Sequence, residues 1–529
     1  MSANPATPED PRPDRTTFGV ELEFLVPYLY DSEVDPLGEV EGLAPLLRQT
    51  DHTGRPENEV RAVIQKLFQD HGLETEIKVY PYKSDDAMRA LDRYSIWVVK
   101  DDPTVRENND STAWFQKYRW VDVEITSPVE PSIPITYEII NYARQLLTHT
   151  YRCRVNSSCG LHVHVGKGAE RFDLVNMRRI SALIWSSEHL FVNLNHPARQ
   201  ANFMTPTCRM NTVIATGRRH GEHDDWQPGD PLDQCMDYLA AEVRHGEEPI
   251  SFKEANLGYD IREGFAKTRE KGHYEPFQWK FPEGQSDEAV VPVDDNERNI
   301  DDEIEDRTEK MAAKSDFQLS TETADEPCRE RTMPRMVNYR YTPDELIELG
   351  DMFGGSGSSF NRDTEDPGVF EGVRQLFNSR SSCDIAWLMF PGGRGYVNFQ
   401  LYECSQFRWS QYGSGHGPKR TIEFRGAEGT LDSWAVTWAK ICVGIIRFAL
   451  YAPADEFMRV LMKCDASDWE FENYDCIDFL DDIGLPVEAA LAEKHLKEKE
   501  WDYNIAYADE PAEPVEPAEP TEPAEPAEE

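Results

Sequence analysis

Short runs in which apolar and polar residues alternate recur along the chain, and this alternation predicts β-strands. Successive side chains of a strand point to opposite faces, so each run has one face suited to burial and one polar face. The predicted strands are residues 16–26, 76–80, 95–100, 119–126, 160–166, 396–402 and 420–426. The pattern therefore predicts a sheet that packs its apolar face on other elements.

Apolar residues at helical spacing lie between and after these strands. The run from Val60 to Phe68, for example, repeats at intervals of three and four residues, which is typical of an amphipathic helix. The predicted helices are residues 58–71, 135–150, 172–194, 342–353, 368–378 and 432–452. Together these elements predict an α+β protein, with helices backing an antiparallel sheet.

The hydrophobic pattern is not continuous, and its gaps define the expected domain organisation. A length of 529 residues is compatible with several domains. We instead predict one large domain that is interrupted once, because the strand pattern resumes after a long acidic stretch. The expected parts are a disordered arm (1–15), the first part of the domain (16–216), an acidic insertion (217–332, disordered at least over 285–332), the second part with C-terminal helices (333–507), and a disordered Glu/Pro/Ala tail (508–529).

Negative charge dominates the chain, with a formal net charge of −43. Residues 285–332 hold 16 acidic and 6 basic residues, and residues 508–529 hold 9 acidic and no basic residues, so −19 of this charge lies outside the predicted core. The remaining charge is still negative. We therefore expect no binding to nucleic acid or to anionic membranes.

Targeting and redox features favour a cytoplasmic protein. The first fifteen residues have no apolar stretch of a secretory signal, and the longest apolar run, 441–450, is too short to span a membrane. The ten cysteines form no CxxC pair, so free thiols are the better interpretation than a disulfide framework or a zinc site. The sequence does not indicate an oligomeric state.

Charged residues are concentrated on the polar faces of four predicted strands. Residues two apart on a strand share a face, which pairs Glu21 with Glu23, Asp122 with Glu124, His162 with His164, and Glu423 with Arg425. Most antiparallel sheets have a polar solvent face, and one such strand alone would mean no more than that. Carboxylates clustered across four strands repel one another unless a cation neutralises them, so a Mg²⁺ or Mn²⁺ site is the more natural explanation.

The order of these motifs resembles a known family. The segments FGVELEF, VEITSP, CGLHVHVG, GYVNF and RTIEFRGAEGTLD, found in this order from residue 16 to about 450, resemble the putative amidoligase family common in fungi. At greater distance, the same elements are similar to glutamine synthetase and glutamate–cysteine ligase. The resemblance implies a glutamine-synthetase-like fold and ATP-dependent joining of a carboxylate to an amine through an acyl phosphate. The substrates would be small-molecule or peptide acids and amines.

The resemblance also implies roles for individual residues, with two or three divalent ions lying between ATP and the strand carboxylates. Glu21 and Glu23 would bind different ions, Glu124 would complete one site, and His162 and Glu423 would complete the other. The remaining three residues would have roles in binding or catalysis. His164 would lie near the nucleotide phosphates, Arg425 would hold the transferred phosphate or the substrate carboxylate, and Asn398 would have a substrate-binding or a structural role.

Further residues remain open from sequence alone. Either Asp101 or Asp102, after the strand 95–100, could join the site. Glu188, Arg199 and Arg209 could contact substrate, although helical glutamates and loop arginines are usually solvated. The glycine-rich loop 354–359 could bind phosphate, and the loop 414–420 could serve as a lid.

Two other functions compete with a ligase. A degenerate ligase fold could persist as a binding or scaffold protein that lacks catalysis. An H-x-H strand also begins the metal site of amidohydrolases, but that fold needs parallel βα units and later His and Asp ligands, where this chain offers Glu423 and Arg425.

Overall fold

The structure is a computed structural model, and it describes the parts of the chain that form the central domain. The described residues are 16–38, 43–50, 55–78, 95–107, 117–168, 172–202, 205–216, 329–336, 338, 341–352, 366–379, 382–390, 395–399, 402, 421–469, 474–498 and 505–506. The expected arm, most of the expected insertion, the loops 354–359 and 414–420, and the expected tail lie outside these residues.

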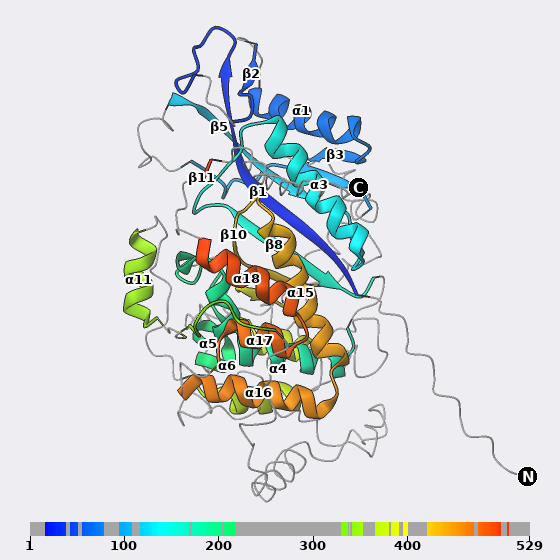
Figure 1. The fold of residues 1–529 in the computed structure, drawn as a ribbon, viewed down its shortest axis with the longest axis vertical. Helices are drawn as coiled ribbons and strands as arrows, with labels where there is room; N and C mark the ends of the chain where they lie inside the picture. Colours follow the sequence, from blue (N-terminus) through cyan, green and yellow to red (C-terminus); the bar gives the residue numbers. More distant parts are fainter. Residues whose placement is uncertain are drawn as a thin grey trace, which may run out of the picture.

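A mixed, mostly antiparallel sheet forms the centre of the fold (Figure 1). Its main path runs through β3 (Thr75–Lys78), β4 (Trp97–Lys100), β5 (Arg119–Thr126), β1 (Thr17–Tyr30), β8 (Gly160–Gly166), β10 (Ile422–Glu428) and β9 (Val397–Asn398). Four short strands pair off this path: β2 (Leu47–Gln49), β6 (Glu130–Pro131), β7 (Arg154–Val155) and β11 (Ile505–Ala506). The strands β3 and β4, and β1 and β2, pair in parallel, whereas β5, β1, β8, β10 and β9 pair antiparallel. The α+β class is therefore confirmed, with two parallel pairs that the alternation pattern did not predict.

Helices account for most of the rest of the described domain. They are α1 (Pro56–Asp70), α3 (Pro134–Thr150), α4 (Leu174–Phe191), α11 (Pro343–Met352), α12 (Val369–Asn378), α13 (Ser382–Leu388), α15 (Trp434–Tyr451), α16 (Ala454–Trp469), α17 (Cys476–Asp482) and α18 (Pro486–Glu498). Four shorter helical turns are η3 (Val192–Leu194), η4 (Pro197–Arg199), α5 (Cys208–Asn211) and α6 (Val213–Thr216). The predicted helix and strand ranges agree with these bounds within a few residues, except at β9.

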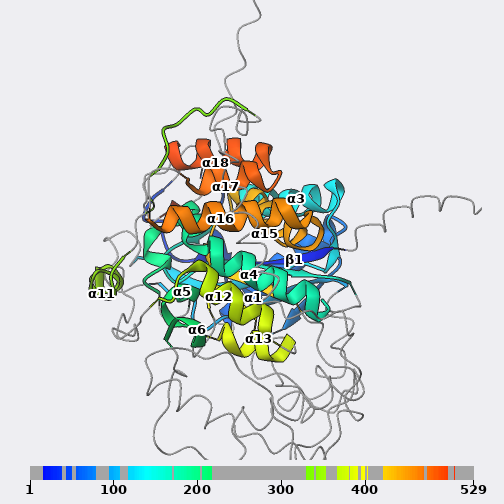
Figure 2. The ribbon, with the colours of Figure 1, turned by 90° about the horizontal axis from the view of Figure 1, so that it is seen from below.

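The apolar face of the sheet packs against α1, α3 and α15, as the alternation predicts. Val20 and Phe24 of β1 and Phe424 of β10 are fully buried and belong to one continuous core. The helix α4 lies behind α15, with α12 and α13 on its other side (Figure 2). From the end of α4, Phe191 reaches Phe424 with ring centroids 6.4 Å apart. Burial of these large side chains fixes which face of each strand is available for chemistry.

The helix α15 is long and apolar enough to span a membrane by length and composition, but 67% of it is buried inside the domain. Trp438, Ile441 and Ile445 are fully buried in the common core. This burial is typical of a core helix.

Residues 329–332 fall within the range expected for the acidic insertion, and the structure places them against α17 and α18. The guanidinium of Arg331 pairs with Asp475 at 2.8 Å and with Asp478 at 2.7 Å. Arg329 pairs with Glu493 at 2.7 Å. These contacts bring the chain back to the domain before residue 333.

Candidate functional site

Five strands bring their polar side chains together on the face opposite the core. Glu21 lies directly opposite His162, Glu23 opposite Glu124, and Glu423 opposite both His164 and Asn398. Directly opposite residues of antiparallel strands share a face, so the register alone gathers these side chains. We call Glu21, Glu23, Glu124, His162, His164, Glu423, Arg425 and Lys100 the site cluster. Most of its members are buried.

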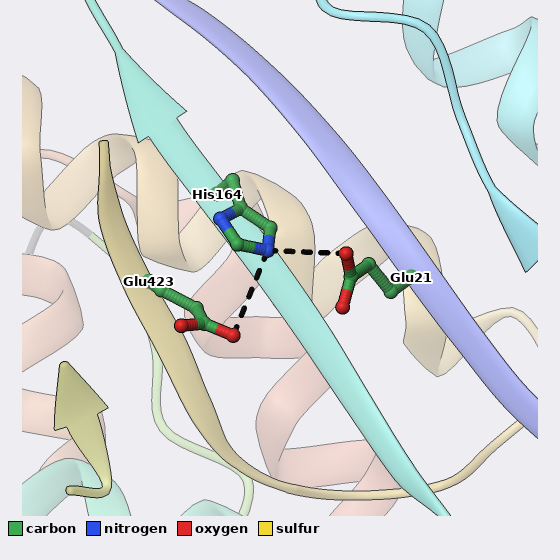
Figure 3. A group of neighbouring side chains, drawn as sticks. All are labelled: Glu21, His164 and Glu423. Atoms are coloured by element: carbon green, nitrogen blue, oxygen red, sulfur yellow. Dashed lines mark ion pairs between the residues drawn. The ribbon is translucent and has the colours of Figure 1, made fainter. Parts of the chain in front are cut away.

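The tightest group within the cluster consists of Glu21, His164 and Glu423, with ligand atoms all within 4.8 Å of one another. Figure 3 shows the imidazole of His164 between the two carboxylates. Its Nε2 atom lies 3.5 Å from Oε1 of Glu21 and 3.6 Å from Oε1 of Glu423, and it makes no hydrogen bond with any described residue. Two carboxylates and one imidazole that converge in this way fit a Mn²⁺ or Mg²⁺ ion.

The other ring nitrogen of His164 is held by a neighbouring strand. Its Nδ1 atom lies 3.1 Å from the hydroxyl of Thr421, one residue before β10. A partner on the far nitrogen fixes the ring orientation of a metal-binding histidine. Thr421 therefore aims Nε2 at the carboxylates, a role that the sequence motifs did not reveal.

His162 lies deeper between the two glutamates of β1. Its Nδ1 atom is 3.1 Å from Oε2 of Glu21, and its Nε2 atom is 3.4 Å from Oε1 of Glu23. Gly160 makes this close packing possible, because a Cβ there would lie 2.9 Å from the imidazole and 3.3 Å from the Glu23 carboxylate. The amide of Gly160 also donates to Glu23 at 2.7 Å.

Arg425 enters the site from an irregularity in β10. The register with β8 shifts between Phe424 and Ala427, and the amides of Arg425 and Gly426 both donate to the carbonyl of Tyr396. Gly426 is required there, because a Cβ would lie 2.0 Å from the Tyr396 ring. Such a bulge re-aims a side chain, and here it directs the guanidinium to Glu423 at 2.5 Å.

Two residues considered for substrate binding make contacts within the protein. Asn398 donates its amide to Oε2 of Glu423 at 2.8 Å, so it orients that carboxylate. Arg199 donates to the carbonyl oxygens of Arg425 at 2.9 Å and Gly426 at 3.3 Å, which supports the bulge. Both residues therefore position the site cluster.

Lys100 is a second residue of the site whose role the sequence motifs did not indicate. It lies at the end of β4 directly opposite Glu124, and its ammonium is 2.5 Å from Oε1 of Glu124 and 3.6 Å from Oε1 of Glu21. The next residue but one, Asp102, accepts from the amide and hydroxyl of Thr104 at 2.7 Å. Burial raises the pKa of Glu23, and the negative charge of Asp102 acts in the same direction.

Burial and neighbouring charges lower the pKa of two carboxyl groups in the site cluster and raise the pKa of two others. Burial alone would raise the pKa of Glu423, but His164, Arg425 and His162 outweigh it and lower the pKa to about 2. The pKa of Glu21 is likewise held well below its usual value, because Lys100 and the imidazoles outweigh burial.

The other two carboxyl groups have a raised pKa. Burial raises the pKa of Glu23, and burial together with the charge of Glu21 raises the pKa of Glu124 well above its usual value. For His164, burial would lower the pKa, but Glu423 and Glu21 reverse this and raise it. A cation bound among these groups would compete with protons for the same lone pairs.

Other charged candidates lie away from the site, in a cluster among the helices. Arg209 is buried and pairs with Asp366 and Asp468, at 2.8 and 2.9 Å. Glu188 is fully buried and accepts from the amide of Cys208. His189 lies 3.2 Å from Asp468. These residues join α4, α5 and α16. Asp122 of β5 also forms an ion pair, with Arg61 of α1 at 2.8 Å.

One comparison with known proteins identifies a family. Residues 14–237 match the model of a family described as putative amidoligase enzyme. No curated protein and no solved structure matches the chain. The match covers the strands that supply Glu21, Glu23, Glu124 and both histidines, whereas β10 follows it. The first part of this chain, with most of the site cluster, is thus similar to the putative amidoligase family.

Proposed function

We propose that this protein is a ligase that uses ATP and a divalent metal ion, Mg²⁺ or Mn²⁺, to join a carboxylic acid to an amine. The observation that carries the proposal is the convergence of Glu21, His164 and Glu423, in which Nε2 of His164 has no hydrogen bond with any described residue. The family match supports the ligase class. A bound divalent ion would supply charge neutralisation for the ATP phosphates.

The proposed reaction has two steps. The substrate carboxylate attacks the γ-phosphorus, ADP leaves, and an acyl phosphate forms. The amine then attacks the acyl carbon, inorganic phosphate leaves, and the amine proton passes to a base or to solvent. Such chemistry depends on positioning and on charge compensation more than on a nucleophilic side chain.

The chain's own residues fit these demands. Arg425 has an Nε atom without a hydrogen bond among the described residues, and its guanidinium can hold phosphate or carboxylate oxygens. Asn398 and Arg425 fix the carboxylate of Glu423 from two sides. The low pKa of Glu423 keeps that carboxylate ionised at neutral pH.

A binding experiment tests the metal requirement. The site cluster presents four carboxylates, which would repel bare phosphates, so a non-hydrolysable ATP analogue should bind only when Mg²⁺ or Mn²⁺ is present. Calorimetric titration with the metal and with EDTA measures this difference. Equal affinity in EDTA would show that no metal links nucleotide and protein.

A trapping experiment tests catalysis. With ATP, Mg²⁺ and a panel of amino acids and short peptides, hydroxylamine should convert an acyl phosphate into a hydroxamate with matching release of ADP. Glu423→Gln should abolish the signal. Glu371→Gln, at a half-exposed residue that pairs with Arg374 on α12, should retain it. Nucleotide binding without hydroxamate for any acid would favour a binding or scaffold protein.

The hydrolase alternative receives no support from the topology. The H-x-H strand β8 pairs antiparallel with both of its neighbours, β1 and β10. A metal-dependent amidohydrolase would also release product from an amide without ATP, which the same assays would detect.

A further inference from the structure

We propose, on the basis of the metal-dependent function proposed above, that Lys100 occupies the position of a second divalent cation. The nucleotide-free protein then binds one divalent ion, at Glu21, His164 and Glu423. Glu124 is committed to the internal ammonium and does not complete a second metal site.

The contacts of Lys100 show that its ammonium lies where a second divalent ion would bind. Its ammonium lies 2.5 Å from Oε1 of Glu124 and 3.6 Å from Oε1 of Glu21, so it sits between carboxylates of two neighbouring strands. A divalent ion bound by Glu124 would lie about 2.0–2.1 Å from a carboxylate oxygen for Mg²⁺. An ion bound to this Glu124 oxygen on the side facing Glu21 would therefore overlap the ammonium and repel it.

The backbone makes this placement persistent. Lys100 is paired in register with Glu124 across β4 and β5, so their side chains leave the sheet as neighbours on one face. The side chain of Lys100 is 21% exposed and that of Glu124 is 9% exposed. A half-buried ammonium beside a buried carboxylate is costly to separate, because each charge would lose its partner in a poorly solvated place.

The geometry leaves one group of the cluster for a divalent ion. Glu124 is paired with Lys100, whereas Glu21, His164 and Glu423 place their ligand atoms within 4.8 Å of one another.

The test counts ions with Mn²⁺ alone, without nucleotide, at about pH 8. Calorimetry, with electron paramagnetic resonance of free Mn²⁺ as a second readout, should give one ion for the wild-type protein. Lys100→Met keeps the apolar stem but removes the ammonium, and it should bind two ions. Lys100→Arg restores the charge and should bind one.

Lys66→Met provides the matched control, because Lys66 pairs with Asp70 on the surface of α1, away from the site; it should bind one ion. Two ions in the wild-type protein, or a single ion in a folded Lys100→Met variant, would overturn the role of Lys100 and leave the metal-dependent function standing. No bound ion in any variant would instead overturn the proposed metal site. If Lys100→Met does not fold, the number of Mn²⁺ ions bound by the wild-type protein decides whether Lys100 has this role.

Discussion

Two groups of charged residues in this protein differ in how their members are paired. In the helix cluster of Glu188, His189, Arg209, Asp366 and Asp468, both aspartates are paired with the guanidinium of Arg209. In the site cluster, four glutamates share one lysine and one arginine. Nε2 of His164 faces two carboxylates and has no hydrogen bond within the part of the chain that the structure describes.

This difference separates structural charge from functional charge. A buried charge network that pairs its own members holds elements together, as Arg209 does for α5, α16 and the segment before α12. In the site cluster, two carboxylates and an imidazole converge within 4.8 Å, and the free energy of such a group improves when a cation binds. Burial alone would not have distinguished the two groups, because members of both are buried.

The largest expected loss of stability comes from removing the arginine of the helix cluster. Arg209→Met leaves Asp366 and Asp468 without their common partner, so the free energy of unfolding should fall by about 3–5 kcal/mol. Urea unfolding measures this loss. Arg374→Met removes a half-exposed arginine from its pair with Glu371 and should cost about 0–1 kcal/mol. Similar losses for both variants would mean that the Arg209 network adds nothing special to stability.

The next prediction concerns the two faces of β10. Phe424 is fully buried in the core, so Phe424→Ala should lower the free energy of unfolding by about 3–5 kcal/mol through a cavity. Val175→Ala, at a position 63% exposed on α4, is the control and should change it by less than about 0.5 kcal/mol. A harmless Phe424→Ala would mean that the apolar and polar faces of this strand are assigned the wrong way round.

On the polar face of the same strand, the expected loss is in rate. Arg425→Ala removes a preorganised charge from the site, and hydroxamate formation should slow by roughly 10²–10³, equivalent to about 2.7–4 kcal/mol. Arg425→Lys should recover little of the lost rate, because an ammonium cannot make the bidentate contact of a guanidinium. Arg374→Ala should keep the wild-type rate. An Arg425→Ala enzyme with full activity would remove this residue from the reaction.

The smallest effect is a pH dependence within the helix cluster. Burial raises the pKa of Glu188 to about 7, so the folded state holds a proton that the unfolded chain releases near pH 4.5. Its contribution to stability is fully present below about pH 4.5 and is lost as the pH rises through about 7. Glu188→Gln keeps the shape and should remove this dependence, for a gain of roughly 2–3 kcal/mol at about pH 8.

Urea unfolding of both proteins at about pH 5 and about pH 8 isolates the effect, since all other groups titrate in both. Glu371→Gln, at a half-exposed carboxylate, should follow the wild-type protein. An unchanged pH dependence in Glu188→Gln would show that this carboxyl group is ionised in the folded protein throughout the range.

The sequence by itself determined the elements and their faces. Alternation over 16–26, 119–126, 160–166 and 420–426 correctly separated the apolar side from the polar side, because the two-residue period is a local property of the strand. The six predicted helical ranges were determined in the same local way, but α13, α16, α17 and α18 were not among them. The strand predicted at 396–402 was the exception: β9 spans two residues, Val397–Asn398, and Tyr396 instead packs at the bulge of β10.

Only the tertiary structure decided which polar residues meet. Strand order and register are non-local, so alternation could not show that His164 would lie between Glu21 and Glu423, or that Lys100 would lie beside Glu124. The bulge that aims Arg425 depends on Tyr396 and Gly426, and the engagement of Glu188 depends on α5 packing against α4. The physical reason is that periodicity fixes the direction of each side chain, whereas the distances between strands come from how the chain pairs and packs.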